Sequence, residues 1–360
     1  MRVAVMRIHP APYREPVLHK LGEDGRFEVD AFSIVGEDGG HSGMALGIDD
    51  RPLAGVRCMS AITGITGVRL AVRLLKRFVF SRRYSYVVWP AYFPWWLTAP
   101  ILADAFLGRR YAVSLDTVRD SGGAICRWIK RFIFRRAAFL WVPGAASCRY
   151  LHDMYGIPQD RIASGLYLPE PLRMDDVSRD GPQTTFLMVA NNVPNRSMDV
   201  MAEGFRKFAV GRDDVRLILC GKDVDSLAGG GVEAVEGGCT WQTLNGMYAK
   251  ADVYVHTGEE QFSTALLLGA MAGVPLLAGA EVGVCADLFE GPGACPGLLV
   301  SNWRSAERWC AAFEEMLKRR DSWPEMGKAA RACASKFDVA DVAKNIGDMF
   351  VRLDAGGRDK

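Results

Sequence analysis

Residues 244–278, LNGMYAKADVYVHTGEEQFSTALLLGAMAGVPLLA, contain one full repeat of the pattern that decides the fold. The run VYVH at 253–256 is short and apolar, as expected for a buried strand. A helix is predicted over 264–272, and the turn GVP at 273–275 leads into a second buried strand over 275–278. A strand, a helix and a strand in this order predict two parallel strands joined by a crossover helix.

The same alternation extends through both halves of the chain. Further strands are predicted at 3–8, 27–35, 56–59, 86–89, 110–116, 139–142, 185–190 and 216–220. Further helices are predicted at 17–21, 68–80, 95–107, 125–136, 199–208, 241–249, 304–318 and 339–353. Parallel sheets covered by helices on both faces follow, so the predicted fold class is α/β with two doubly wound, Rossmann-like domains facing across a cleft.

The length of 360 residues also favours two domains, because single cores stop growing at about 250–300 residues. The polar, proline-bearing stretch 166–184 is the predicted linker between domains at 1–165 and 185–335. We expect the helix in 336–360 to pack back towards the N-terminal domain. Ligands of such folds bind at the carboxyl ends of the strands, which predicts an enzyme or binding protein with its site in the cleft.

Composition excludes several classes of protein. With 49% hydrophobic and 24% charged residues, the chain is neither disordered, collagenous nor a coiled coil. Nine cysteines without a CxxC pair favour reduced thiols in the cytoplasm over disulfides or a zinc site. The first strand is followed by HPAPYRE instead of a GxGxxG turn, which argues against dinucleotide binding. The apolar runs are too short for a signal peptide or a membrane-spanning helix.

Four stretches together resemble the retaining glycosyltransferases of the GT-B fold, specifically family 4 of the bacterial cell-surface polysaccharide type. They are 244–278, FLMVANNVPNRSMDVMAEGF (186–205), GLLVSNW (297–303) and, more loosely, WVPGAASCRYLHDMYGIPQDRIA (141–163). The resemblance covers about residues 140–350. It implies transfer of a sugar, in the EC 2.4 class, from a nucleotide-sugar to a hydroxyl acceptor that is a polysaccharide or lipid-linked oligosaccharide precursor.

By this resemblance, the C-terminal domain binds the donor. Arg196 stands where the family has a lysine for the donor diphosphate, and Glu260 matches the first carboxylate of the Glu-x7-Glu pair, a catalytic position near the donor sugar. The amides of Phe262, Ser263 and Thr264 at a predicted helix start would meet the diphosphate and sugar. Each position has a plainer alternative: Arg196 as a solvated loop residue, and Ser263 or Thr264 as an ordinary helix cap.

Two donor positions depart from the family pattern. The second glutamate is Leu268, and the family arginine is Asn191, which is equally compatible with a turn-forming role. Leucine accepts no ribose hydrogen bond, and a charge-assisted hydrogen bond is worth about 1.5–3 kcal/mol. An alternative function is therefore a catalytically impaired partner or regulatory subunit. His256 replaces a family proline and is expected to be a core or hydrogen-bonding histidine.

In the N-terminal domain, the resemblance implies that Arg14, in the first strand-to-helix loop, lies on the acceptor or phosphate side. Asp116, at the end of the strand predicted at 110–116, falls by this resemblance at the sugar-reacting centre, where it would act as a base or orient the acceptor hydroxyl. A helix-start ion pair for Arg14 and an N-cap for Asp116 are the alternatives. No metal and no cofactor are expected, because basic residues and helix dipoles neutralise the diphosphate.

Charge differs between the two halves of the chain. Residues 1–180 carry 25 Lys and Arg against 18 Asp and Glu, whereas residues 181–360 carry 19 against 24. The excess lies in two amphipathic segments, 68–83 and 126–136, which are typical of helices at an anionic membrane surface. Their expected membrane-facing residues are Arg73, Lys76, Arg77, Lys130, Arg131 and Arg135.

Buried helices with solvated edges are the alternative interpretation of these two segments. Nucleic acid binding is not expected. We expect a cytoplasmic protein, peripheral on the inner face of the plasma membrane.

Overall fold

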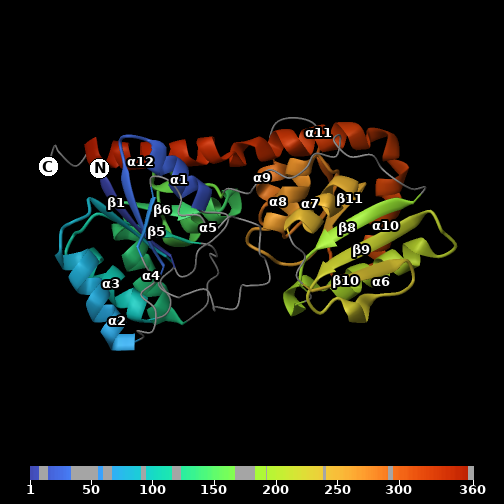
Figure 1. The fold of residues 1–360 in the computed structure, drawn as a ribbon. Helices are drawn as coiled ribbons and strands as arrows, with labels where there is room; N and C mark the ends of the chain where they lie inside the picture. Colours follow the sequence, from blue (N-terminus) through green and yellow to red (C-terminus); the bar gives the residue numbers. More distant parts are fainter. Residues whose placement is uncertain are drawn as a thin grey trace. The chain divides into compact units, whose positions relative to one another are not determined.

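A computed structural model describes residues 1–7, 15–33, 56–59, 67–90, 95–115, 123–166, 183–191, 193–237, 241–290 and 295–355. The chain forms two compact units. The described residues among 1–166 and 337–355 belong to unit 1, and those among 183–336 belong to unit 2 (Figure 1). The predicted linker at 166–184 falls almost wholly outside the described residues.

Unit 1 is built on a seven-stranded, all-parallel sheet in the order β3-β2-β1-β4-β5-β6-β7. Its strands are β1 (Arg2–Arg7), β2 (Glu28–Ser33), β3 (Val56–Met59), β4 (Tyr86–Pro90), β5 (Tyr111–Ser114), β6 (Phe139–Val142) and β7 (Ile162–Ser164). The helices are α1 (Glu15–Glu23), α2 (Gly67–Leu74), a π-helical turn (Leu75–Phe80), α3 (Trp95–Phe106), α4 (Ala124–Arg136), α5 (Ala145–Tyr155) and α12 (Val339–Ala355). The predicted helix at 68–80 is therefore an α-helix that continues as a π-helix.

Both faces of this sheet are buried, as expected for parallel strands. Val3 and Val5 of β1 belong to the core cluster with α1 and α12, whereas Ala4 and Met6 belong to the cluster with α2, α3, α4 and α5. Figure 1 shows α1 and α12 on one side of the sheet and α2, α3 and α4 on the other. Consecutive side chains of a strand point to opposite faces, so one apolar run supplies both cores. The C-terminal helix α12 thus completes a core of unit 1, beside α1.

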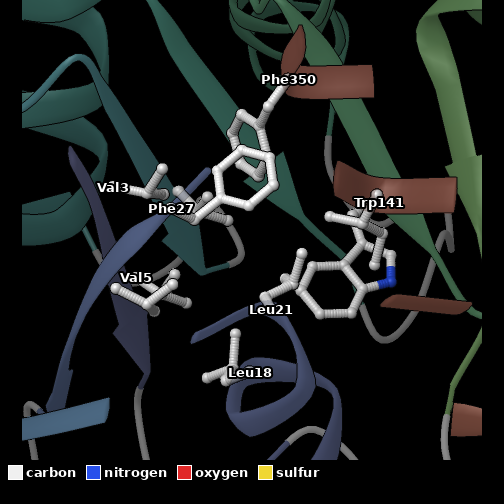
Figure 2. A pocket seen from close by; sticks show the side chains of 10 residues that line it. Val3, Val5, Leu18, Leu21, Phe27, Trp141 and Phe350 are labelled. Atoms are coloured by element: carbon white, nitrogen blue, oxygen red, sulfur yellow. The ribbon is translucent and has the colours of Figure 1, made fainter. Parts of the chain in front are cut away.

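A small cavity remains in this core, between β1, α1 and α12 (Figure 2). Its lining is entirely apolar and includes Val5, Leu18, Trp141 and Phe350. The volume is about 10 Å³, no more than one water molecule requires. The cavity is therefore a packing gap and not a ligand site.

Unit 2 has a six-stranded parallel sheet in the order β10-β9-β8-β11-β12-β13. Its strands are β8 (Thr184–Val189), β9 (Val215–Gly221), β10 (Val232–Glu236), β11 (Val253–His256), β12 (Leu276–Gly279) and β13 (Gly297–Val300). Its α-helices are α6 (Met198–Ala209), α7 (Trp241–Lys250), α8 (Thr264–Ala272), α9 (Cys285–Leu288), α10 (Ala306–Lys318) and α11 (Trp323–Ala334). The predicted α/β class with two Rossmann-like sheets is confirmed.

The core on one face of this sheet is rich in aromatic residues. Phe186 of β8 packs against Phe205 of α6 and Phe313 of α10 with ring centroids 5.8 and 5.1 Å apart. A Cβ on Gly204 would lie 2.5 Å from the Cβ of Trp309, so only glycine permits this approach of α6 to α10. The packing holds β8, which supports half of the candidate site described next.

Candidate functional site

The order of the strands in unit 2 reverses between β8 and β11, which makes this the topological switch point. The chain leaves β8 towards β9 on one side and leaves β11 towards β12 on the other, so the loops that follow the two strands diverge. In open α/β sheets the crevice between such loops binds ligands. The relevant loops span 190–197 and 257–263.

Several contacts join these two loops. Glu259 donates its backbone N–H to the Asn195 carbonyl at 3.0 Å, and Asn195 Nδ2 donates to the Glu259 carbonyl at 3.2 Å. Gly258 has φ of +115°, and a Cβ there would lie 2.9 Å from Cα of Arg196. The close approach and the left-handed backbone both require glycine. Arg196 and Glu260 are thereby brought together across 64 residues of sequence.

Arg196 and Glu260 form an ion pair at this point. Arg196 ends a short 3₁₀ turn, Pro194–Arg196, and its Nη2 donates to Glu260 Oε1 at 3.0 Å. Both side chains are largely buried, with 18% and 25% exposed. Arg196, predicted to bind the donor, and Glu260, predicted to be catalytic, thus lie in contact at the switch point.

The second oxygen of Glu260 is held by His256. His256 Nε2 lies 2.9 Å from Glu260 Oε2, at the carboxyl end of β11. Burial by itself raises the pKa of Glu260, but the hydrogen bond with His256 and the charge of Arg196 outweigh it, so this pKa lies below its usual value of 4.5. Glu260 is therefore an ionised carboxylate that bridges two nitrogen donors.

His256 is fixed by the core of unit 2. It is 1% exposed, and its ring stacks on Tyr254 with centroids 6.3 Å apart and planes 16° apart. The Tyr254 hydroxyl lies 3.2 Å from the backbone nitrogen and 3.3 Å from the carbonyl oxygen of Val189. The histidine is thus a buried, hydrogen-bonded residue, and it joins β11 to the site.

The start of α8 adjoins Glu260. Ser263 is the N-cap, 1% exposed, and its hydroxyl accepts the Leu266 backbone N–H at 3.2 Å. The side chain of Ser263 therefore has the ordinary capping role. Phe262 and Thr264 are half-buried beside it. Leu268, one turn further along, is buried at 4% exposure, so an apolar residue suits its position.

Asn191 lies beside a lysine that the motifs do not mark. Asn191 is exposed after β8, and its Oδ1 accepts the Lys222 backbone N–H at 3.1 Å. The turn that follows is held by Glu236, whose carboxylate accepts the N–H groups of Asp223, Val224 and Asp225 at 2.8, 2.9 and 3.3 Å. Asn191 thus has the turn-forming role, and Lys222 places a cation at the same edge of the sheet.

Another ionic cluster was not predicted from the sequence. Arg304, after β13, lies 3.4 Å from both Glu259 and Glu281, and it covers the Trp303 ring at 3.9 Å. These residues tie the loops after β11, β12 and β13 to each other at the edge of the site. Glu259 and Trp303 lie within the motif stretches 244–278 and 297–303, but Glu281 and Arg304 lie outside them, so the motifs did not indicate the cluster.

Two predicted residues lie outside the described part of the chain. Asp116 follows Leu115, the described residue after β5, and Arg14 directly precedes α1 in the sequence. Their placement therefore remains a prediction, as does the acceptor side of the proposed site.

The basic segments of unit 1 are only partly at the surface. Arg73, Lys76, Arg131 and Arg135 are exposed. Arg77 is half-buried over the ring of Phe32, at 5.0 Å from its centroid. Lys130 is 4% exposed, so the expectation that it faces a membrane surface is wrong. Its position on the inward side of α4 explains the error, because the helix places it with buried Ile133 and Phe134.

Exposed apolar residues accompany these cations. Ile125 and Trp128 of α4 are 75% and 62% exposed, and Phe106 at the end of α3 is 66% exposed. Trp128 and Phe106 both lie against Phe132, with ring centroids 5.9 and 4.7 Å apart. This aromatic surface therefore joins α3 and α4. No helix in the described ranges is long and apolar enough to cross a membrane.

Comparison with known proteins identifies the fold. No family model matches the chain, and no curated protein matches its sequence. Among solved structures, a glycosyltransferase from Rickettsia africae ESF-5 is similar with a TM-score of 0.70 and 11% identity, over 98% of each chain. Anabaena HepE in complex with UDP and glucose has a TM-score of 0.67 and 13% identity, over 98% of this chain and 100% of that one.

A third similar structure is a putative UDP-N-acetylglucosamine 2-epimerase from Listeria monocytogenes. Its TM-score is 0.63 at 14% identity, over 100% of this chain and 97% of the other. The chain has the GT-B fold, as these similarities to solved structures show.

Proposed function

We propose that the protein is a glycosyltransferase that moves a sugar from a nucleotide-sugar to a hydroxyl acceptor with retention of configuration. The observation that carries the proposal is the Arg196–Glu260 ion pair at the switch point of unit 2. A cation, a carboxylate and the first amides of α8 meet there, which are the groups that a diphosphate and a sugar require. A hexose is the proposed sugar, and a polysaccharide or lipid-linked oligosaccharide precursor is the proposed acceptor.

In this mechanism the donor binds over the start of α8. Arg196 holds the diphosphate, whose negative charge grows as the glycosidic bond breaks, and the amides of Ser263 and Thr264 add fixed positive dipoles. Glu260 contacts the donor sugar through its ionised carboxylate. Asp116 acts as base for, or orients, the acceptor hydroxyl, and Arg14 assists on the acceptor side. The reaction needs no metal, so we expect EDTA to leave turnover unchanged.

The donor proposal is tested by thermal shift and turnover with a panel of nucleotide-sugars. A ligand present at a concentration of 100 times its dissociation constant stabilises the folded protein by about 2.7 kcal/mol. We expect one member of the panel to do so, and Arg196→Ala and Glu260→Gln to reduce turnover at least tenfold. Arg319 and Glu315 form an exposed Arg–Glu ion pair on the same unit, at 2.7 Å, so Arg319→Ala and Glu315→Gln serve as controls.

Two results would count against this proposal. If no nucleotide-sugar shifted the unfolding temperature, the site would not bind such donors. If a donor bound but no acceptor or water ever received its sugar, the protein would instead be a binding or regulatory member of the fold. The anomeric configuration of the product, read by NMR, tests retention.

We also propose that unit 1 binds an anionic membrane surface on the cytoplasmic side, where a lipid-linked acceptor would be found. Support comes from exposed Arg73, Lys76 and Arg131 together with exposed Ile125 and Trp128. Sedimentation with vesicles of anionic lipid is the test. Binding to the vesicles should weaken in Arg131→Gln and in Trp128→Ala, and it should vanish with neutral lipid. Binding that stays the same under all three changes would refute the proposal.

A further inference from the structure

Glu260 has two partners of different kinds. Arg196, at Oε1, is a flexible side chain with 18% of its surface exposed, whereas His256, at Oε2, is 1% exposed. An incoming diphosphate competes with Glu260 for the guanidinium, because both are anions that pair with arginine. His256 is out of reach of such competition. When a donor binds, the histidine is the partner that Glu260 retains.

Contacts within the sheet of unit 2 hold the ring of His256 in place. Its strand β11 pairs with β12 through His256 and Ala278, and its ring stacks on Tyr254. The Tyr254 hydroxyl is in turn anchored to the backbone of Val189 on β8. The imidazole is therefore fixed relative to both strands at the switch point, and its Nε2–H fixes where the carboxylate lies.

Histidine is an energetically unfavourable choice for this position unless Nε2 is needed. His256 Nδ1 is buried and has no hydrogen-bond partner in the described part of the protein. An unpaired buried polar atom destabilises a fold. A phenylalanine would stack on Tyr254 without this penalty. Among the described residues, Glu260 is the one recorded hydrogen-bond partner of the ring.

We infer that His256 is a positioning residue, which holds Glu260 against the donor sugar when the diphosphate draws Arg196 away. The inference rests on the proposed function of the site. His256 does not touch the reacting atoms; it acts through the orientation of the Glu260 carboxylate. Its removal should impair the step that needs Glu260 and leave nucleotide binding intact.

The experiment compares His256→Phe, which keeps a ring on Tyr254, with His256→Gln, whose amide N–H can still reach Glu260. With the nucleotide-sugar that the wild type turns over, we expect His256→Phe to lower kcat about tenfold to a hundredfold. The Kd of the nucleoside diphosphate without sugar should stay within twofold. His256→Gln should recover kcat to within about threefold of wild type.

The chain supplies a matched control. His19 and Glu23 of α1 form another His–Glu pair at i and i+4, with 3.0 Å between Nε2 and Oε1, in unit 1. His19→Phe should leave kcat and Kd unchanged.

The outcomes separate this inference from the function on which it rests. A wild-type protein that binds no nucleotide-sugar would refute the proposed function. A wild type that turns over its donor, with His256→Phe equally active or His256→Gln as poor as His256→Phe, would refute the positioning role alone. Equal loss of kcat and of nucleoside diphosphate binding would assign His256 a merely structural role.

Discussion

Asp104 allows a quantitative test of the structure. It lies on the inner side of α3, 1% exposed, and its Oδ2 accepts the Trp89 indole N–H at 2.7 Å. Burial raises the pKa of Asp104 from 3.8 to about 7, although the hydrogen bond from Trp89 and the charge of Arg109 oppose the shift. The folded protein therefore retains a proton that the unfolded chain releases near pH 4.

The sign of the effect on stability follows from proton binding. Between about pH 4 and pH 7 the folded state binds more protons than the unfolded state, so the contribution of Asp104 to stability falls as pH rises. One pKa unit corresponds to about 1.36 kcal/mol, so a shift of about three units amounts to about 4 kcal/mol. Asp104→Asn removes the titration and keeps an oxygen that accepts the Trp89 hydrogen bond.

We expect Asp104→Asn and wild type to have similar free energies of unfolding at pH 4 and the variant to be more stable at pH 8. Urea unfolding followed by circular dichroism, at several pH values, measures the difference. Taking the difference between the two proteins cancels titrations that both share. A difference that does not change between pH 4 and pH 8 would refute the assigned protonation of Asp104.

Three further predictions concern unit 2 and the thiols. Gly258→Ala should lower the free energy of unfolding by about 1–3 kcal/mol, because alanine is strained in the left-handed backbone of this position and its Cβ would press on Arg196. The variant should also bind the donor more weakly. An unchanged melting temperature and an unchanged Kd would contradict this prediction. Glu236→Gln should lower the melting temperature at pH 7, because the carboxylate that accepts three backbone N–H groups is lost. Backbone hydrogen bonds hold the pKa of Glu236 below its usual value, and they are lost on protonation, so acid should lower the melting temperature of the wild type as well. Exposed Cys126 should react quickly with a thiol reagent at pH 8, whereas Cys285, whose pKa burial raises to about 12, should react only on unfolding.

Much of the fold was predictable because runs of apolar residues in the sequence mark the segments that are buried in the protein. The strands predicted at 3–8, 253–256 and 275–278 correspond to β1 (Arg2–Arg7), β11 (Val253–His256) and β12 (Leu276–Gly279). The short edge strand β10 was missed, since Val232–Glu236 has only three apolar residues, with two glutamates between and after them, and directly follows three glycines. The π-helical turn at Leu75–Phe80 was missed for another reason, because its apolar spacing does not differ from that of an α-helix.

The candidate site was predictable only in part. Arg196 and Glu260 were marked by motifs, but nothing in the sequence says that residues 64 positions apart pair with each other. His256 was expected to be a core or a hydrogen-bonding residue, yet its partner depends on the loop after β11, which no periodicity describes. Lys130 was misplaced because a helical charge pattern alone did not show which side of α4 packs on the sheet.

The return of α12 to unit 1 has a consequence for biosynthesis. Unit 2 ends at residue 336, whereas unit 1 needs residues 339–355 to cover Val3, Phe27 and Tyr86. During synthesis the chain leaves the ribosome with its N-terminus first, so the whole of unit 2 emerges before α12, the last helix of unit 1. The domain that begins first is thus finished last, and until then the part of its apolar sheet face that α12 covers, beside α1, stays exposed.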